Sequence, residues 1–385
     1  MMSRLVLLFA VVQALLGARV IARLVQTANG RRIERSLQPA SLAADHQVTV
    51  LVPVLNEAAR LAPCLEGLIA HGAEISEILV IDGGSSDGTP EIVTSFAACD
   101  PRVRLLDATP VPADRNGKAH GLQVGLSHSC PAAGWVLTID ADVRPDPLLV
   151  RSLLAHAAAE RVPALSAATL QRLSGAAEGL VHPALLATLV YRFGIPGHAT
   201  NRVDQVQANG QCFLVRRAVL DAAGGFATGL DSVCEDVTVA RAIAAQGHRV
   251  GFYETDDLVA VEMYAGWREA WDNWTRSLPM RDRLVRGSGD LGLAEILLVQ
   301  ALPLWLAPLL AWLLGARHPA TMLNVGLVCT RIGVLAGMAR AYAVRPWTYW
   351  LSPLCDLPVA VRLWTMSRRR RHTWRGRAIV PGDLA

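Results

Sequence analysis

Asp140 and Asp142 are the residues of this chain whose type and spacing most directly suggest chemistry. They follow the apolar segment 135–139, which has the composition of a buried strand. Two carboxylates two residues apart, just beyond the carboxyl end of a strand, form an oxygen-rich corner that suits Mg²⁺ or Mn²⁺, and such cations usually bind together with substrate phosphates. Because Asp-x-Asp is also frequent in solvated turns, the interpretation as a metal site depends on the surrounding residues.

The elements that must position these carboxylates lie in residues 45–285, where apolar segments alternate with helical patterns. We expect strands at residues 47–54, 77–82, 103–107 and 135–139, and helices at residues 57–71, 88–98 and 115–128. Unbroken apolar strands that alternate with helices are typical of an α/β domain whose parallel sheet is buried on both faces. Ligands of such sheets bind beyond the carboxyl ends of the strands.

Two further strand ends carry polar residues. The first strand leads into Pro53, Asn56 and Glu57, and the second leads into Asp82, which is followed by two glycines, two serines and Asp87. The glycines permit close approach of the backbone to a ligand, and the serines and Asp87 can cap the next helix, which leaves Asp82 directed into the crevice. The alternative is a capped strand-to-helix turn without a ligand.

Lys118 is the only lysine of the chain, beside 36 arginines. An ammonium group is a point charge that can lie against phosphate oxygens or a carboxylate in a way that a planar guanidinium does not reproduce. Lys118 is therefore a candidate phosphate contact, and the alternative is a surface lysine at the start of a helix.

Together these motifs resemble those of the family-2 glycosyltransferases with a GT-A nucleotide-diphospho-sugar transferase fold. The matching motifs are Pro53-x-x-Asn56-Glu57, Asp82-Gly83-Gly84-Ser85-x-Asp87-Gly88-Thr89, Gly117-Lys118-Ala119, Asp140-x-Asp142 and Glu235-Asp236. In layout the chain is similar to membrane-anchored enzymes that glycosylate lipids, namely the ceramide glucosyltransferase-like, hopanoid-associated and carotenoid (myxol-type) groups. The resemblance implies a Rossmann-like, mainly parallel sheet and transmembrane helices at both ends of the chain.

The resemblance also implies a role for each matching residue. Asp236 would be the general base, Asp142 the ligand of Mg²⁺ or Mn²⁺, and Asp82 the contact to the uracil ring of a UDP-sugar. The other donor contacts would be Pro53, Glu57, Lys118, Asp140 and Arg276, and the acceptor side would include Gly210, Gln211, Glu235 and Trp274. One carboxylate base without a carboxylate nucleophile implies inversion at the anomeric carbon. The alternative for Glu235 and Asp236 is an acidic first turn that the helix dipole favours.

One motif departs from the family pattern. Relatives often carry Gln-x-x-Arg-Trp after the base, and the nearest match is the segment 273–277, in which only Arg276 is kept. The altered motif argues against a processive polymer synthase. In the same region Trp267, Trp271 and Trp274 lie on one helical face near several arginines, which is typical of a helix in the membrane surface. The alternative is an aromatic face packed into the core.

Apolar residues gather at the two ends of the chain, which is 52% hydrophobic and only 18% charged. Residues 5–18 carry no charge and are followed by arginines rather than by a small-residue cleavage site, so we expect an uncleaved anchor. Segments 291–314 and 321–344 are apolar enough to span a membrane. Segment 347–366 contains Asp356, Arg362 and two prolines, so it is a poor span, a re-entrant segment or a surface helix.

Arginines after the first and last apolar segments place both flanks in the cytoplasm, which requires an even number of C-terminal crossings. We expect a multi-pass protein of the inner membrane whose catalytic domain faces the cytoplasm. The expected units are an N-terminal anchor (1–28), a GT-A domain (45–264), an interfacial helix (265–286), a C-terminal transmembrane region (287–366) and a basic cytoplasmic tail (367–385).

The charge pattern argues against a nucleic-acid partner. The net charge of +4 comes from the arginines that flank the apolar segments, and no basic stripe interleaved with aromatic residues occurs in the central part. The seven cysteines have no paired spacing, which fits a reducing compartment and no zinc site.

We therefore expect an inverting, metal-dependent glycosyltransferase that moves a hexose from a UDP-sugar to the hydroxyl of a membrane lipid, with a carotenoid or hopanoid-type alcohol as the narrower expectation. The alternative enzyme glycosylates a polyprenyl phosphate or an envelope polysaccharide. An alternative of another class is a catalytically silent membrane scaffold on the same fold, although a scaffold has no need for Asp82, Lys118, Asp140, Asp142 and Asp236 together.

Overall fold

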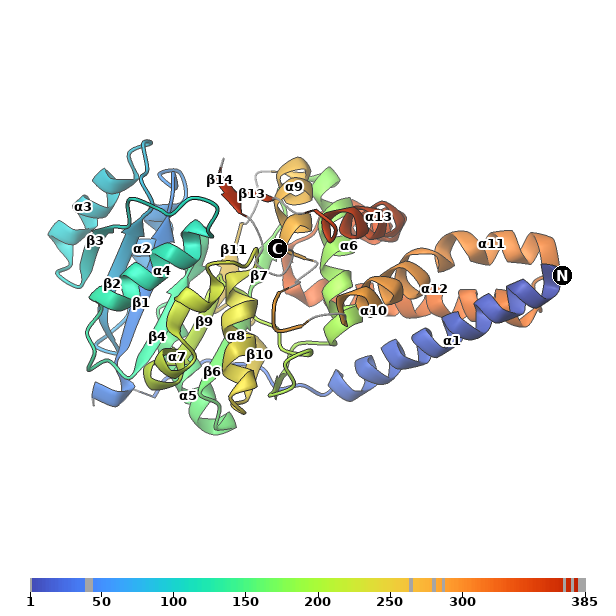
Figure 1. The fold of residues 1–385 in the computed structure, drawn as a ribbon, viewed down its shortest axis with the longest axis horizontal. Coiled ribbons are helices and arrows are strands. Elements are labelled where there is room, and N and C mark those ends of the chain that lie inside the picture. Colours follow the sequence, from blue (N-terminus) through green and yellow to red (C-terminus); the bar gives the residue numbers. More distant parts are fainter. Residues whose placement is uncertain are drawn as a thin grey trace.

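The computed structural model describes residues 2–38, 44–262, 266–278, 282–285, 288–369, 372–374 and 377–379. A layered α/β part holds the large sheet, and helices α1 (Met2–Thr27), α11 (Pro303–Leu314) and α12 (Pro319–Met338) project away from it as a bundle (Figure 1). The predicted fold class, an α/β domain with apolar helices in the N- and C-terminal regions, is confirmed by this arrangement.

An eight-stranded sheet in the order β3-β2-β1-β4-β9-β6-β10-β8 forms the centre of the α/β part. Its strands are β1 (Val48–Val54), β2 (Ile75–Asp82), β3 (Val103–Asp107), β4 (Trp135–Ile139), β6 (Ala164–Ala168), β8 (His198–Thr200), β9 (Cys212–Arg216) and β10 (Val250–Glu254). The four strands that the sequence predicts pair in parallel. The other half of the sheet differs, because β9 runs antiparallel to both β4 and β6. The sheet is therefore mixed, with more parallel than antiparallel pairs.

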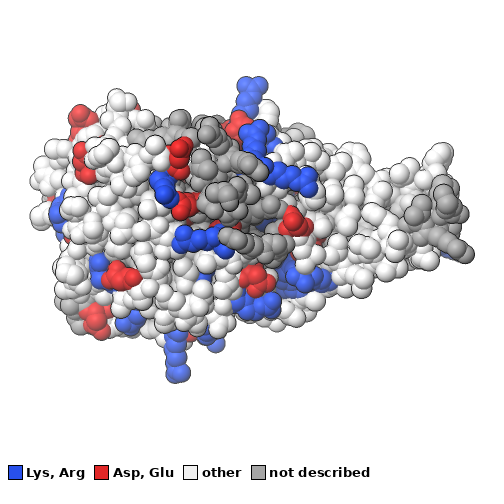
Figure 2. Space-filling view, viewed as in Figure 1, with Lys and Arg blue, Asp and Glu red and all other residues white. Residues whose placement is uncertain are grey.

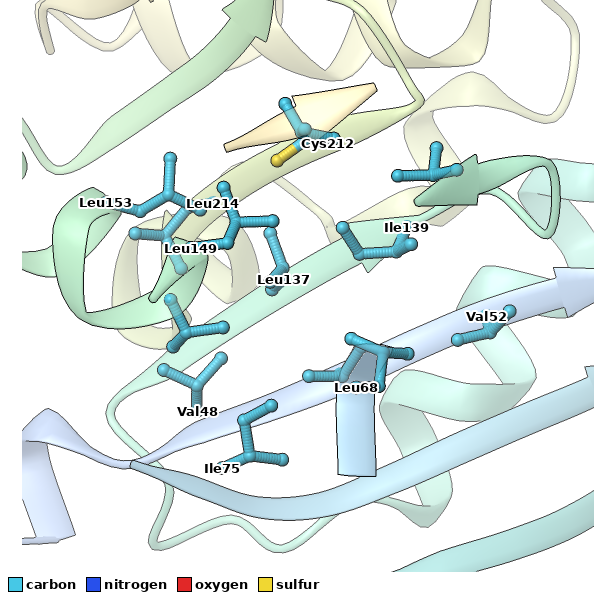
Figure 3. Close-up of a cluster of buried hydrophobic side chains, with 14 of the residues drawn as sticks. Val48, Val52, Leu68, Ile75, Leu137, Ile139, Leu149, Leu153, Cys212 and Leu214 are labelled. Carbon is cyan, nitrogen blue, oxygen red and sulfur yellow. The ribbon is translucent and has the colours of Figure 1, made fainter. Parts of the chain in front are cut away.

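Helices cover both faces of the sheet. On one face Val48 and Val52 of β1 and Leu137 of β4 pack with α2 (Leu61–Ile69) and α5 (Leu149–Glu160), as Figure 3 shows. On the other face Leu51 and Val136 pack with α4 (Gly117–His128) and α8 (Glu235–Ala245). Each of these fully buried side chains contributes roughly 1.5–3 kcal/mol relative to exposure. This double burial holds the carboxyl ends of β1, β2 and β4 at one rim.

The other helices of the α/β part are α3 (Thr89–Cys99), α6 (Ala176–Phe193), α7 (Arg217–Ala222) and α9 (Trp267–Ser277), with 3-10 turns at Ala44–His46 and Gly225–Gly229. A second sheet has the order β12-β7-β11-β5 and contains β5 (Val143–Pro145), β7 (Leu170–Arg172), β11 (Val259–Val261) and β12 (Tyr342–Val344). Strands β13 (His372–Trp374) and β14 (Arg377–Ile379) form a hairpin. Because β12 follows the projecting helices, its pairing with β7 ties them to the α/β part.

Two helices are long and apolar enough to cross a membrane among the described residues: Val6–Thr27 in α1 (Met2–Thr27) and Pro319–Ala341, which is α12 (Pro319–Met338) with a 3-10 turn (Ala339–Ala341). The predicted span 291–314 is not one straight helix. It is a pair, Asp290–Ala301 and Pro303–Leu314, bent by 54°. The pair comprises α10 (Ser288–Glu295), a π-helical turn (Ile296–Ala301) and α11 (Pro303–Leu314).

Proline and π-type hydrogen bonding explain the bend. Pro303 has no N–H to donate, and the N–H of Leu302 bonds the carbonyl of Leu297, five residues back, at 3.0 Å. The carbonyl of Leu298 is thus released from the helical pattern, and Gln13 Nε2 of α1 donates to it at 2.8 Å. Gln13 also exchanges two side-chain hydrogen bonds with Asn324 of α12, so a buried polar cluster joins the three helices.

Segment 347–366 contains a 3-10 helix (Trp347–Cys355) and α13 (Asp356–Met366), and it is not among the candidate spans of the described chain. Trp347 is 73% exposed, whereas Asp356 is buried and bonded to Arg331 of α12 at 2.7 Å.

The basic residues Arg370, Arg371 and Arg375 that support the predicted orientation lie outside the described residues. On the face shown in Figure 2, charged side chains gather over the α/β part and are nearly absent from the projecting end.

Helix α9 places its tryptophans in two environments. Trp271 and Trp274 pack in a cluster with residues of α6 and α13, whereas Trp267 is 40% exposed. The aromatic face is thus partly core, which is the alternative named above. Arg281 and Arg286, which belong to the interfacial pattern, lie outside the described residues, and the interfacial helix stays a prediction.

Candidate active site

Four segments meet beyond the carboxyl end of β4: the turn 140–142, the start of α4, the segment before β9 and the start of α8. They line one cavity of about 770 Å³. Nine of the residues singled out from the sequence line it, namely Lys118, Asp140, Asp142, Gly210, Gln211, Glu235, Asp236, Trp274 and Arg276. Pro53, Glu57 and Asp82 are not part of its wall.

Lys118 is positioned by the cap and the packing of α4. The side-chain oxygen of Asn116 accepts the N–H groups of Lys118 at 2.9 Å and Ala119 at 3.0 Å, which satisfies two donors of the first turn. Gly125 lets α4 lie against the sheet, since a Cβ there would meet Ile81 at 2.8 Å. The helix start is thereby fixed at the rim.

The ammonium of Lys118 lies between carboxylates from two segments. Its Nζ is 2.7 Å from Asp140 Oδ1 and 3.2 Å from Glu235 Oε1. Burial alone would lower the pKa of Lys118, but the charges of Asp140, Glu235 and Asp236 outweigh burial and hold it well above its ordinary value. Lys118 is therefore charged at every physiological pH.

Asp236 lies in the first turn of α8, where three donors hold its carboxylate. Oδ2 accepts the N–H of Gly210 at 2.5 Å, and Oδ1 accepts the N–H of Val237 at 2.8 Å and the thiol of Cys234 at 3.1 Å. Burial and the charge of Glu235 raise the pKa of Asp236 to about 6, against the opposing charge of Lys118 and these donors. The carboxylate is ionised at neutral pH and more basic than an ordinary aspartate.

Glycine is required at position 210 by the closeness of these groups. A Cβ at Gly210 would lie 2.6 Å from Lys118 Nζ and 3.2 Å from Asp236 Oδ2. The neighbouring Gln211 is buried, and its Oε1 accepts from Thr169 at 2.7 Å and from Asn209 at 3.0 Å. These bonds fix the segment that presents the N–H of Gly210 to Asp236.

Asp142 provides the chemistry that a cation would need. Its Oδ1 is buried and has no hydrogen-bond partner in the described part of the chain. Burial and the charges of Asp140 and Glu57 raise its pKa to about 7. A divalent cation would satisfy this oxygen, so the residues fit a metal. No group of three or more His, Cys, Asp or Glu side chains among the described residues is arranged to hold one, which suits an ion that is bound by one or two carboxylates together with substrate phosphates.

The loops after β1 and β2 bind each other. The side-chain oxygen of Asn56 accepts the N–H of Ser86 at 2.9 Å, and Asn56 itself has a φ of 55°. Asp82 accepts the N–H and the hydroxyl of Ser85, the latter at 2.5 Å. These bonds account for the polar motif as a structured pair of turns. The N–H groups of Glu57 and Ala58 also donate to side chains of Thr89 and Asp87, and α2 begins at Leu61, later than the sequence predicts. A contact of Asp82 to a nucleotide stays a prediction.

Beyond the carboxylates the cavity becomes apolar. Its outer walls come from α1, α6 and α12, through Ile21, Leu24, Leu186, Leu189, Val334 and Met338 among others. Trp274 and Arg276 of α9 also line the cavity, and the Trp274 ring lies against His182, 4.6 Å between ring centres. A single space thus connects the polar cluster with the helices that are candidates to cross a membrane.

Sequence reasoning missed Asn116, Cys234 and the apolar wall. Asn116 and Cys234 directly precede two of the motifs but received no role, although Asn before a helix is a recognisable N-cap signal. The apolar wall left no signal, because it combines residues from three helices far apart in the chain.

Residues 49–221 match the family model of glycosyl transferase family 2. A dolichyl-phosphate beta-glucosyltransferase of Trichomonas vaginalis is 35% identical over 102 residues, which cover 24% of this chain and 28% of that protein. The chain thus spans less than a third of that relative. A 4,4'-diaponeurosporenoate glycosyltransferase of Staphylococcus aureus is 25% identical over 72% of this chain and 71% of its own length.

Among solved structures, the mannosyltransferase PcManGT from Pyrobaculum calidifontis, in complex with GDP-Man and Mn²⁺, has a TM-score of 0.55 at 20% identity. The match covers 95% of this chain and 99% of that chain. At this identity the likeness shows the fold alone. Residues 49–221 are therefore similar to the family-2 glycosyltransferases, and the chain has the fold of the solved mannosyltransferase.

Proposed function

We propose that this chain is a family-2 glycosyltransferase that moves a hexose from a UDP-sugar to the hydroxyl of a membrane lipid, with inversion at the anomeric carbon, and that the lipid is an alcohol of carotenoid or hopanoid type. The observation that carries the proposal is the cavity, whose polar end holds Lys118, Asp140 and Asp236 and whose apolar end is walled by α1, α6 and α12. A lipid can lie along these helices with its polar end at the carboxylates.

Asp236 acts as the general base in this proposal. The carboxylate takes the proton of the acceptor hydroxyl while the hydroxyl oxygen forms a bond to the anomeric carbon, and the bond from that carbon to the diphosphate breaks. The N–H of Gly210 on Oδ2 and the N–H of Val237 on Oδ1 orient the carboxylate. No second carboxylate serves as a nucleophile, so one displacement inverts the configuration.

Lys118 and Arg276 bind the departing diphosphate, since both are cations that line the cavity. Asp142 would hold Mg²⁺ or Mn²⁺, and the bound cation would offset charge on the leaving diphosphate. Asp140 lies on the donor side, with Asp82, Pro53 and Glu57 as nucleotide contacts. Glu235, Gly210, Gln211 and Trp274 form the acceptor side.

The chemistry of the base favours a hydroxyl acceptor over the alternative, a polyprenyl phosphate. A phosphate oxygen is already ionised at neutral pH and needs no base, whereas a hydroxyl must lose its proton during transfer. The pKa of Asp236, raised to about 6, suits that task. The match of residues 49–221 to the family model favours an enzyme over a catalytically silent scaffold.

We further propose that the protein is a multi-pass inner-membrane protein with its catalytic domain in the cytoplasm. The bent pair ending in α11 and the returning α12 make an even number of C-terminal passages if the pair counts as one span. Arg19 and Arg23, near the α/β end of α1, support a cytoplasmic placement of that end.

The proposal is tested with membranes that contain the full chain. They are incubated with labelled UDP-glucose, UDP-galactose or GDP-mannose and a lipid extract, and the labelled product is identified by mass. We expect a labelled neutral glycolipid that is made from a UDP-sugar and is absent with Asp236→Asn. A phosphate-containing product would support the polyprenyl-phosphate alternative, and product formation by Asp236→Asn would refute the assigned base.

A further inference from the structure

We propose that Cys234 is a positioning residue for Asp236, because its thiol donates a hydrogen bond to the carboxylate and thereby sets the strength of the base. The inference rests on the proposed role of Asp236. Cys234 Sγ lies 3.1 Å from Asp236 Oδ1, and Cys234 also lines the cavity. The thiol is therefore in contact with the base at the place where the acceptor would bind.

Cys234 lies directly before α8, and its side chain does not cap this helix. Cys234 is the N-cap residue, where Ser, Thr, Asn or Asp would accept a backbone N–H and stabilise the helix by about 1 kcal/mol. The Cys234 side chain makes no such capping bond. Its backbone is fixed on both sides, since its N–H bonds Ser232 Oγ at 3.0 Å and its carbonyl accepts the N–H of Thr238 at 3.2 Å. The thiol is thus directed at Asp236 instead.

A donor to an ionised carboxylate stabilises the charged form and lowers the pKa of the acid. Of the three donors on Asp236, two are backbone N–H groups of Gly210 and Val237, and only the thiol of Cys234 can be removed by substitution. The contact acts in both directions, since burial and the charge of Asp236 hold the pKa of Cys234 well above its ordinary value.

Other charged groups also act on the pair, and none of these residues is changed when Cys234 is replaced. Glu235 of α8 and Lys118 of α4 act on Asp236, and Arg241 of α8 and Arg192 of α6 act on Cys234. A change seen with Cys234 variants therefore reports the thiol contact.

The first experiment compares pH–rate profiles for transfer from UDP-glucose to the lipid extract. In Cys234→Ala we expect the rate to fall at a pH that is higher by roughly half a unit on the acidic side of the profile (the acidic limb). This is the size of the effect that a weak donor to a charged group produces. Cys234→Ser keeps a donor on the same carbon and should return the limb towards the wild-type position. An unmoved limb in Cys234→Ala, or the same shift in both variants, would overturn the inference. Cys99→Ala, an exposed cysteine on α3, is the control.

The second experiment needs no substrate. The full chain in detergent is alkylated with iodoacetamide at pH 8, and the modification of each cysteine is measured by mass spectrometry. Asp236→Asn removes the negative charge beside the thiol, so Cys234 should react at least about fivefold faster while exposed Cys99 reacts at an unchanged rate. An unchanged Cys234 rate would refute the contact. If instead Asp236→Asn still transfers sugar, the proposed function fails while the labelling result stands.

Discussion

Lys118 Nζ lies 2.7 Å from Asp140 Oδ1, and this ion pair joins the start of α4 to the end of β4. The same ammonium is 3.2 Å from Glu235 Oε1, at the start of α8. A single positive charge therefore lies between the proposed donor side and the proposed acceptor side. No other lysine exists in the chain to replace it.

We expect Lys118→Arg to lower kcat/KM for the UDP-sugar nearly as much as Lys118→Met does. Both variants should lower kcat/KM for the UDP-sugar by about 10- to 100-fold, the cost of a lost hydrogen bond to a charged group. Arginine fails because the space beside Nζ is filled by Gly210, where even a Cβ would come within 2.6 Å. Steady-state kinetics measure the effect, with Arg104→Lys at the exposed sheet edge as the control. Wild-type kinetics in Lys118→Arg would contradict the tight fit.

The pH dependence of transfer should follow Asp236. Its pKa is raised to about 6, so the carboxylate is ionised above pH 6 and protonated below it. Because the base must be ionised, kcat/KM is expected to fall up to tenfold per pH unit below about 6 and to be level between 7 and 8. Asp236→Asn should lower the rate by about 10²- to 10⁴-fold. A profile that stays level down to pH 4.5 would exclude Asp236 as the base.

Metal removal should abolish transfer, and Mn²⁺ or Mg²⁺ should restore it. The pKa of Asp142 is raised to about 7, so protons compete with the metal below pH 7. The Mn²⁺ concentration for half-maximal activity should therefore rise as pH falls from 7 to 6, and Asp142→Asn should raise it at every pH. Titration of EDTA-treated membranes with Mn²⁺ measures both effects. Full activity in EDTA would remove the metal from the reaction.

The buried pair of Arg331 and Asp356 should matter for stability rather than for chemistry. Arg331 Nε lies 2.7 Å from Asp356 Oδ2, and Gln300 Nε2 donates to Asp356 Oδ1 at 2.9 Å. Asp356→Asn leaves a buried guanidinium without its counter-charge, which is expected to cost about 3–5 kcal/mol. Joint replacement of Arg331 and Asp356 by leucine should cost less. Thermal unfolding in detergent compares the two, and equal losses would contradict the argument.

Local patterns predicted one half of the sheet. Strands β1 to β4 were recognisable because each is a short apolar segment followed by polar residues, and parallel topology then brought Asp140 to the same rim as Asp82. Strand β9 has the same apolar composition, so nothing in Cys212–Arg216 marks it as the antiparallel strand between β4 and β6. Strand partners depend on long-range packing that a local pattern does not contain.

The candidate site, like the sheet, could be predicted from the sequence only in part. Lys118, Asp140 and Asp236 could be selected because each stands in a short motif, and the structure brings them to one cavity. The apolar wall could not be selected, because Leu24, Leu189 and Val334 look like ordinary residues of three separate helices. The bend at Pro303 also escaped prediction, since the hydrophobic composition of segment 291–314 is that of an unbroken span.

Two glycines of α12 offer the sharpest test of the lipid end of the cavity. Gly333 and Gly337 line it, and a Cβ at either position meets nothing within 4 Å, so a larger side chain extends into the cavity without disturbing the helix. Gly333→Leu and Gly337→Leu are expected to raise KM for the lipid at least about tenfold, because an occupied volume cannot also hold the acceptor. The KM for UDP-sugar should stay within about twofold.

Gly326→Leu is the matched control for this test. Gly326 lies on the same helix and also has nothing within 4 Å of its Cβ position, but it does not line the cavity. The substitution therefore adds the same side chain to α12 outside the proposed acceptor space, and it should leave both KM values unchanged. If Gly326→Leu impairs transfer as much as Gly337→Leu, the loss comes from the membrane insertion or folding of α12. If all three variants use the lipid normally, the acceptor does not pass between α1, α6 and α12.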